Sequence, residues 1–250
     1  MKLYKIVLLF LTFILFLLTS EVNVFAHQDA EGVYLITETD EPIVVSLGCH
    51  CAPAQYITQF GLRNYAFPFD WLFSNNFDGF CDLIENDFAS FLDPNLLNVH
   101  PVLPFVVIND LYKIEFRHDF PSVGSTQVES ILVPNWKDFS IEVNEKYNRR
   151  IARFRDLGNY KSKVFFIRMA YNSGISYEGP KVITRGESVI LRDILKRKFP
   201  QTDFALIIVN YENELNKIDI SPWNLEGILN FTIKDYSSGF SQIFKDLGLL

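Results

Sequence analysis

The stretch that decides the fold of this chain is residues 43–71, which read IVVSLGCHCAPAQYITQFGLRNYAFPFDW. It opens with three consecutive β-branched residues, a pattern typical of a strand that is buried on both faces. Gly48 then interrupts the apolar run where a tight turn is needed. Pro53 suits the first turn of a helix, whose amide groups have no intrahelical partner, and Gly61 is a typical helix stop. The stretch therefore predicts a strand, a turn with the sequence Cys-His-Cys, and a helix.

Further along the chain, short apolar runs alternate with amphipathic helical patterns. We expect buried strands at residues 43–47, 164–168, 204–209 and 228–233, further strand-like runs at 102–108 and 112–116, and helices at 53–61, 77–91, 139–157, 187–199 and 240–247. Such alternation is typical of right-handed crossovers between parallel strands. The sequence therefore predicts an α/β fold in three layers, with a mostly parallel sheet covered by helices on both faces. This layout is Rossmann-like or SGNH-hydrolase-like, and the runs at 102–116 are candidates for an added hairpin.

The first 26 residues have the pattern of a secretory signal peptide. Lys2 and Lys5 precede an apolar run at residues 6–18, and residues 24–26 read VFA, a sequence that suits signal peptidase. Cleavage would leave residues 27–250 as a single α/β domain in a secreted, periplasmic or other extracytoplasmic compartment. The alternative is an uncleaved amino-terminal anchor, which would bring the protein to a membrane.

Charge and motif content restrict the partners of the chain. Its formal net charge is −7, and the acidic balance makes nucleic acid or an anionic membrane surface a poor match. The sequence has neither a glycine-rich dinucleotide fingerprint nor a phosphate-binding loop, so no cofactor is expected. The Cys-His-Cys run lacks the second ligand pair of a structural zinc site, so no metal is expected either. We therefore expect a small-molecule, peptide or glycan substrate.

Cys51 is the candidate nucleophile. A cysteine just ahead of a helix amino terminus faces free amide protons and the positive end of the helix dipole, and both favour the thiolate. Amide groups of residues 48–52 could hold an oxyanion. Two alternatives stay open: Cys51 is a buried small apolar side chain, or it forms a disulfide. Cys81 is a better disulfide partner than Cys49, which is too close in sequence for easy bridging.

His118 is the histidine that we favour as the base for this thiol. It follows the alternating run 112–116 and has polar neighbours that could orient an imidazole and keep one edge wet. His50 is adjacent to Cys51, and neighbouring side chains in an extended turn point apart. His100 lies between Val99 and Pro101 and has the pattern of a loop surface residue. A histidine paired with a carboxylate for stability alone is the competing reading of His118.

Three residues are candidates to orient this base. Asp119 is adjacent to His118, but strand geometry would place the two side chains on opposite faces. Asp70 or Asn210 could fill the role instead.

The predicted topology also gathers a set of polar residues on one rim of the sheet. Open parallel sheets place ligand sites at the carboxyl ends of their strands, near a reversal in the strand order. The turn at residues 49–51, Arg168 with Tyr171 and Asn172, and Asn210 with Tyr211 all follow predicted strands. We therefore expect Asp70, Trp71, Arg168 and Asn210 to contribute to substrate binding, with the PFDW loop at 68–71 as a wall of the pocket.

A set of short blocks links this chain to a known family. The blocks SLG (46–48), Cys51, LR (62–63) and PFDW (68–71) are followed by FRHDF (116–120), YNRRI (147–151) and FFIR (165–168). Together they resemble a bacterial and viral family described as papain-like cysteine peptidases, over residues 43–210. The resemblance implies Cys51 as nucleophile and His118 as base, in the Cys-then-His order of papain-like enzymes. The chain departs from papain in its shorter Cys-to-His separation, its parallel sheet and its additional thiol, Cys49.

Two functional hypotheses follow. The leading one is a secreted cysteine hydrolase, with papain-like peptidase or esterase chemistry, in which Cys51 attacks an amide or ester and His118 acts as base and then as acid. The strand, turn, nucleophile and helix also resemble serine hydrolases whose nucleophile follows the first strand, and this analogy includes esters and acetylated glycans. The alternative is a non-catalytic secreted binding protein in which Cys51 is structural or bonded to Cys81.

Overall fold

The computed structural model describes residue 36 and residues 40–126, 129–170, 182–212 and 221–250. All of them fall within one compact unit, Tyr34–Leu250. The predicted signal peptide, together with Tyr171 and Asn172 of the predicted rim, lies outside the described residues. In the part of the chain that the structure describes, no helix is both long enough and apolar enough to cross a membrane.

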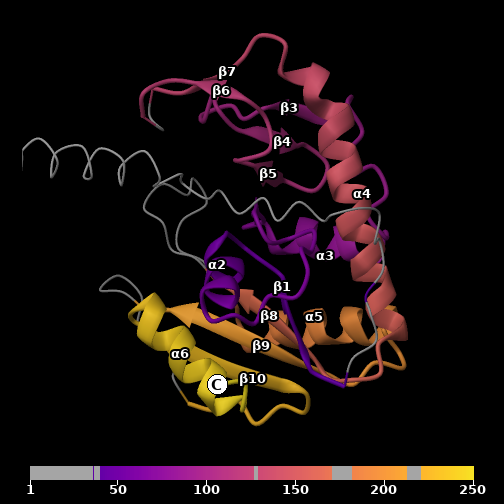
Figure 1. Ribbon diagram of the computed structural model, residues 1–250, viewed down its shortest axis with the longest axis vertical. Coiled ribbons are helices and arrows are strands. Elements are labelled where there is room, and N and C mark those ends of the chain that lie inside the picture. The colour runs from indigo at the N-terminus through magenta and orange to yellow at the C-terminus, as the bar shows by residue number, and fades with distance from the viewer. Residues whose placement is uncertain (1–35, 37–39, 127–128, 171–181, 213–220) are drawn as a thin grey trace, which may run out of the picture. The chain divides into compact units, whose positions relative to one another are not determined.

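A parallel sheet of four strands forms the centre of the fold. Its strands are β1 (Ile43–Ser46), β8 (Val164–Met169), β9 (Phe204–Tyr211) and β10 (Ile228–Ile233), hydrogen-bonded in the order β1-β8-β9-β10 (Figure 1). All three pairings are parallel, so the carboxyl ends of the strands share one edge. The predicted α/β class with a mostly parallel sheet is therefore confirmed. The spatial order of these four strands follows their order in the chain, so there is no reversal of strand order among them.

Alternate side chains of the sheet enter two different hydrophobic clusters, as expected for strands buried on both faces. Along β8, Val164 and Phe166 join the larger cluster, whereas Phe165 and Ile167 join the smaller one. Helices α2 (Ala52–Gln59) and α6 (Tyr236–Asp246) contribute to the smaller cluster. Helices α3 (Phe77–Glu85), α4 (Ser140–Asp156) and α5 (Arg185–Lys198) contribute to the larger one. Both faces of the sheet are thus covered.

A second, antiparallel sheet replaces the simple hairpin that the sequence predicts. It has the order β2-β5-β4-β3, from β2 (Leu72–Phe73), β5 (Ile114–Phe116), β4 (Val107–Asn109) and β3 (Leu97–Val99), and a separate hairpin joins β6 (Ser122–Val123) to β7 (Ile131–Leu132). The strand predicted at 102–108 begins only at Val107. Pro104 has no amide proton to donate, and Val106 N donates to Leu103 O in a turn.

Helix α3 is shorter than the predicted 77–91. It ends at Glu85, and Asp87, Phe88 and Ser90 have positive φ values of 51°, 62° and 57°. Phe88 and Phe91 are nevertheless buried, because the turns that follow the helix carry their rings back into the core. Apolar residues at helical spacing in this segment are therefore buried partly by the helix and partly by the turns that follow it.

Helix α4 matches its prediction closely and connects the two sheets. Figure 1 shows it running alongside both of them. Its Tyr147 ring lies 5.6 Å from that of Phe116 on β5, and its Phe154 ring lies 6.3 Å from that of Phe166 on β8. Short 3-10 turns at Trp136–Phe139 and Leu157–Asn159 flank it. The helix therefore fixes the antiparallel sheet relative to the parallel one.

Candidate active site

The Cys-His-Cys turn follows β1 and is fastened on both sides. Gly48 O accepts a 3.0 Å hydrogen bond from Met169 N at the end of β8, and Cys49 O accepts a 2.9 Å bond from Ser74 N after β2. Gly48 has φ +75°, and a Cβ there would lie 3.2 Å from Ser74 Oγ and 3.3 Å from Phe69 O. Glycine is thus needed both for the backbone conformation and for the close approach. The peptide bond between Gly48 and Cys49 is cis.

Arg168 supports this turn from inside the protein. Its Nη1 donates to Leu47 O at 2.7 Å and to Ser74 Oγ at 2.6 Å, and its Nη2 donates to Ser74 O at 2.5 Å. Its guanidinium carbon lies 3.9 Å from the centre of the Phe80 ring, and the residue is 2% exposed. The sequence predicts a role for Arg168 in substrate binding, which stays a prediction. The contacts described for this side chain are with the scaffold beneath the turn.

Cys51 occupies the N-cap position of α2 and is half-buried. Burial raises the pKa of its thiol, while the Cys51 backbone amide and the positive charge of Arg117 act in the opposite direction. The sequence predicts a thiolate favoured by the helix terminus. That expectation is wrong in direction, because the loss of solvent outweighs the amide and the nearby charge. A thiol of this kind needs a base before it can act as a nucleophile.

The three cysteines differ in accessibility. Cys49 and Cys81 are buried, and Cys51 is the half-exposed one. Cys51 and Cys81 both carry reduced thiols, so the disulfide considered for this pair is not formed in this structure. Burial raises the pKa of Cys81 to about 12. Cys51 is therefore the thiol of the three that solvent and a substrate can reach.

His50, the middle residue of the turn, has a buried side chain in the neutral form. Its Nδ1 accepts a 3.1 Å hydrogen bond from Ala52 N, which places the proton of the neutral ring on Nε2. Burial, with the charges of Arg168 and Arg117, lowers the pKa of His50 to about 3. Since the Nδ1 lone pair is already occupied, His50 is unsuited to take a proton from Cys51.

This buried histidine gives the stability of the protein a defined pH dependence. Its pKa is about 3 in the folded chain and 6.5 ordinarily, so between these values the unfolded chain binds a proton that the folded chain does not. Its contribution is complete above pH 6.5 and is lost as the pH falls toward 3. We expect this group alone to remove about 2 kcal/mol of unfolding free energy between pH 7 and pH 5.

The measurement is urea unfolding at both pH values, for the wild type and for His50→Asn. The amide oxygen of asparagine can replace Nδ1 as acceptor but does not titrate. Burial also lowers the pKa values of His100 and His118, and comparing the two proteins cancels their contribution. An equal loss of stability in both proteins would contradict the assignment.

His100 and His118 are placed differently. His100 Nδ1 accepts bonds from Val102 N (3.2 Å) and Leu103 N (3.0 Å), so this ring organises its loop. His118 follows β5 and is exposed, and neither of its ring nitrogens is hydrogen-bonded to a group in the described ranges. Partial burial lowers the pKa of His118, and the Asp119 carboxylate opposes this shift. His118 is therefore neutral near pH 7 and has an available lone pair.

The side chain of Asp119 is anchored to α4. Its Oδ1 accepts a 2.5 Å bond from Lys146 Nζ, and its Oδ2 accepts a 3.1 Å bond from Tyr147 OH. The carboxylate is 3% exposed. Asp119 thus acts on His118 through its charge, and both of its oxygens are bonded to helix α4.

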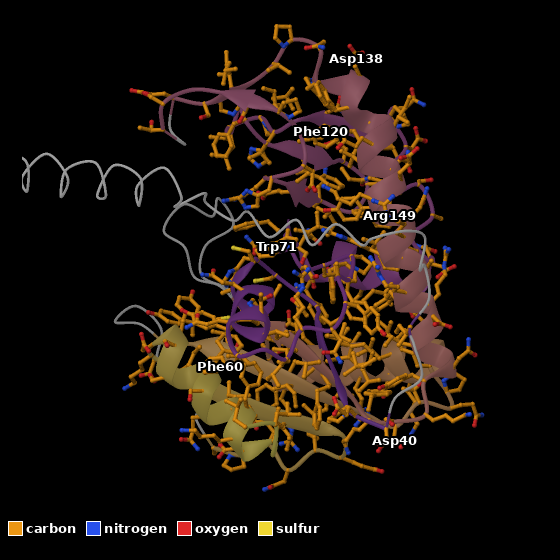
Figure 2. The ribbon with its side chains drawn as sticks, in the orientation of Figure 1. Asp40, Phe60, Trp71, Phe120, Asp138 and Arg149 are labelled. Atoms are coloured by element: carbon orange, nitrogen blue, oxygen red, sulfur yellow. The ribbon has the colours of Figure 1, made fainter. Side chains whose placement is uncertain are left out.

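The other predicted site residues also make scaffold contacts. Asp70 Oδ2 accepts from Arg63 Nη2 at 2.6 Å and from Phe67 N at 2.9 Å, which shapes the PFDW loop. Asn210 bonds both the amide and the carbonyl of Ile183, each at 3.0 Å. Trp71 is only half-buried, and Figure 2 shows it between α2 and the antiparallel sheet. Trp71 is therefore the residue of this loop best placed to touch a ligand.

Arg117 is the site residue that sequence reasoning missed. Its guanidinium carbon lies 3.6 Å from the centre of the Phe73 ring, and its Nε and Nη2 donate to Glu115 Oε2 at 2.9 and 2.8 Å. Its charge lowers the pKa values of both Cys51 and His118, so one guanidinium lies near the two predicted catalytic groups. The alternation along residues 112–117 could have placed Arg117 and Glu115 on one side of the strand. It could not have revealed Phe73 opposite them.

A row of aromatic rings borders the same turn. Tyr211 at the end of β9 stacks on Tyr236 with 4.9 Å between ring centres, and Tyr236 is parallel to Tyr56 of α2 at 6.1 Å. The His50 ring meets Tyr236 edge-on at 6.1 Å and lies 6.1 Å from Phe73. The carboxyl edge of the sheet thus has an aromatic border beside Cys51. Over the described ranges, no three His, Cys, Asp or Glu side chains converge as a metal-binding group.

Comparison with known proteins identifies the family of this chain. Residues 43–214 match the model of a family described as "Putative papain-like cysteine peptidase". The chain belongs to this family. The match to the papain-like peptidase family includes the Cys-His-Cys turn, the antiparallel sheet, α4, α5 and strands β8 and β9.

One curated relative is an uncharacterised protein of Acanthamoeba polyphaga mimivirus. It is 28% identical over 196 residues, which is 72% of this chain and 81% of the relative. No solved structure matches the chain. The resemblance inferred from the SLG, PFDW and FRHDF blocks is therefore confirmed at the level of the family.

Proposed function

We propose that this protein is a secreted cysteine hydrolase, with papain-like peptidase or esterase chemistry, in which Cys51 is the nucleophile and His118 the base. In this proposal residues 1–26 are a signal peptide, and residues 27–250 act as one domain in an extracytoplasmic compartment. Membership of the peptidase family supports the reaction class. The half-exposed Cys51 thiol at the carboxyl edge of the sheet supports the choice of nucleophile.

The availability of the His118 ring is the observation that carries the proposal. His50 and His100 both use Nδ1 to accept backbone amide protons, so neither has a lone pair for the Cys51 proton. Of the three histidines in the described ranges, His118 is the one whose ring is not committed in this way. Because burial raises the pKa of Cys51, the step needs such an acceptor.

The reaction begins when a neutral ring nitrogen of His118 accepts the Cys51 proton and the sulfur attacks the substrate carbonyl carbon. The carbonyl oxygen becomes an oxyanion, and the His118 imidazolium then protonates the departing amine or alcohol as its bond to carbon breaks. This leaves a thioester on Cys51. Water attacks the thioester while His118 accepts its proton, and proton return to the sulfur releases the acid and restores the thiol.

The amide groups of the turn restrict where the oxyanion can bind. Gly48 N donates to Ser46 Oγ at 3.2 Å, Ala52 N donates to His50, and Pro53 has no amide proton. The Cys51 amide already lies toward its own sulfur, where it lowers the thiol pKa. Because the Cys51 N–H acts on the sulfur itself, we assign the oxyanion to this amide, with Trp71 as the contacting wall and Asp70, Arg168 and Asn210 holding the shape of the pocket.

The class of acyl substrate is broader than peptides. The order of strand, turn, nucleophile and helix resembles that of serine hydrolases whose nucleophile follows the first strand, an analogy of layout that includes esters among the possible substrates. An ester or an acetylated glycan therefore suits the proposal as well as a peptide does. The raised pKa of the Cys51 thiol is the observation that favours the second candidate, a secreted binding protein with a structural cysteine.

The rate at which iodoacetamide alkylates Cys51 distinguishes the two. We expect Cys51 to react at pH 7 with a rate that His118→Ala lowers by about a hundredfold or more, the lower end of the usual contribution of a general base. Mass spectrometry of the Cys51 peptide gives the rate. His100→Asn is the matched control, because its side-chain oxygen can keep the loop contacts, and it should react like the wild type. If Cys51 is unreactive, or if His118→Ala leaves the rate unchanged, the hydrolase is excluded.

A further inference from the structure

Arg117 is held rigidly, with one edge of its guanidinium still open. Glu115 accepts hydrogen bonds from the edge formed by Nε and Nη2, and the Phe73 ring covers one face of the guanidinium plane. Within the described ranges Nη1 donates to no protein group, and the side chain is 18% exposed. A guanidinium fixed on one edge offers its other edge, Nη1 and the outer proton of Nη2, to a planar anion.

Arg117 and the turn that carries Cys51 are linked through Phe73 and Ser74. Phe73 pairs with Glu115 across β2 and β5, and its ring is 6.1 Å from that of His50, the neighbour of Cys51. The residue after Phe73 is bonded to the turn itself, through Ser74 N and Cys49 O. The charge of Arg117 also acts on the Cys51 thiol. The fixed cation is therefore near enough to the nucleophile for its charge to act on the thiol.

We propose that Arg117 determines specificity by binding a carboxylate of the substrate beside Cys51, so that the enzyme prefers acyl substrates with an acidic group close to the bond that is cleaved. This inference rests on the proposed hydrolase and names its substrate class. The protein as a whole is acidic, with a formal net charge of −7. Long-range attraction therefore does not draw such substrates in, and the preference comes from this one guanidinium.

Two alkylating probes of nearly equal shape test the proposal without a known substrate. Iodoacetate carries a carboxylate where iodoacetamide carries a neutral amide, and in both cases the Cys51 thiolate displaces iodide. The ratio of the two rates does not depend on the fraction of thiolate, because both reagents use the same thiolate. N-acetylcysteine in the same buffer gives the ratio for a thiol with no cation beside it.

We expect the iodoacetate-to-iodoacetamide ratio at Cys51 to exceed that of N-acetylcysteine by about tenfold, the effect of one charge-assisted hydrogen bond. Arg117→Gln should return it to the N-acetylcysteine value. Glu115→Gln should raise it above the wild type, because the carboxylate that competes for Arg117 is gone. Protection of buried Cys81 from both reagents verifies that each variant is folded. A wild-type ratio equal to that of N-acetylcysteine, or a ratio unchanged in both variants, overturns the proposal.

His118→Ala separates this proposal from the hydrolase on which it rests. The variant should lower both alkylation rates together and leave their ratio unchanged. If His118→Ala changes neither rate while the ratio remains high, the hydrolase fails and carboxylate binding stands. If His118→Ala slows both reagents but the ratio equals that of N-acetylcysteine, the carboxylate preference fails alone.

Discussion

Replacing Arg168 with methionine is expected to lower the free energy of unfolding by about 3–5 kcal/mol, the range for breaking a buried charged network. Methionine fills much of the same volume but donates no hydrogen bond. Leu47 O and Ser74 O then lose donors that lie at 2.7 and 2.5 Å in the wild type. A buried carbonyl without its donor bears the full cost of its desolvation.

Urea unfolding followed by tryptophan fluorescence measures this loss. Arg185→Met is the matched control, because Arg185 is exposed at the start of α5, where its removal should change stability by less than about 0.5 kcal/mol. The turn that carries Cys51 should loosen with the loss of Arg168. A decrease of less than 1 kcal/mol for Arg168→Met, roughly the value of an ordinary hydrogen bond, would mean that the turn is held by other contacts.

Truncating Phe154 to alanine is expected to cost a similar amount, about 3–5 kcal/mol. The residue is fully buried, and its ring lies 6.0 Å from Phe69, 5.6 Å from Phe88 and 5.3 Å from Phe199. These contacts join α4 to the PFDW loop and to the covered face of the parallel sheet. Removing the ring leaves a cavity that rigid neighbours of this size cannot fill.

Ile141→Ala on the same helix is the control for Phe154→Ala. Ile141 is 74% exposed, and alanine has the higher helix propensity, so we expect a change within about 0.5 kcal/mol of zero. Thermal and urea unfolding of both variants measure the difference. Comparable losses at the two positions would contradict the assignment of the cost at Phe154 to core packing.

The sequence was sufficient to predict the elements whose pattern repeats over many residues. Strands β1, β8, β9 and β10, helix α4 and the turn with Cys51 all lie within a few residues of their predicted positions. Strands β2 and β3 were missed because two or three residues are too few to show a period. The helix predicted at 77–91 is longer than α3, because the turns after Glu85 bury Phe88 and Phe91 at the same spacing that a helix would give.

The position of Cys51 in the chain fold was predictable from the sequence, but the electrostatics around it were not. Local spacing placed Cys51 at a helix start, and the structure agrees. The direction of its pKa shift depends on how much solvent the folded chain removes, which no local pattern encodes. The guanidinium of Arg117 is held in place by the ring of Phe73, which lies 44 positions earlier in the chain. Contacts of this kind arise from the pairing of strands, so they follow only once the topology is known.

The pairing of β1 with β8 has a consequence for when the turn that carries Cys51 becomes ordered. Ile43 is paired with Val164, so the whole antiparallel sheet and α4 are made by the ribosome between the two strands. Closing so long a loop is slow and entropically costly. Until residues 164–169 have emerged from the ribosome, the turn lacks two of its hydrogen bonds. These are the bond from Arg168 to Leu47 O and the bond from Met169 N to Gly48 O. Strand β8, which is synthesised after the whole antiparallel sheet, therefore completes the support of the turn, and a chain that ends before β8 carries Cys51 without these contacts.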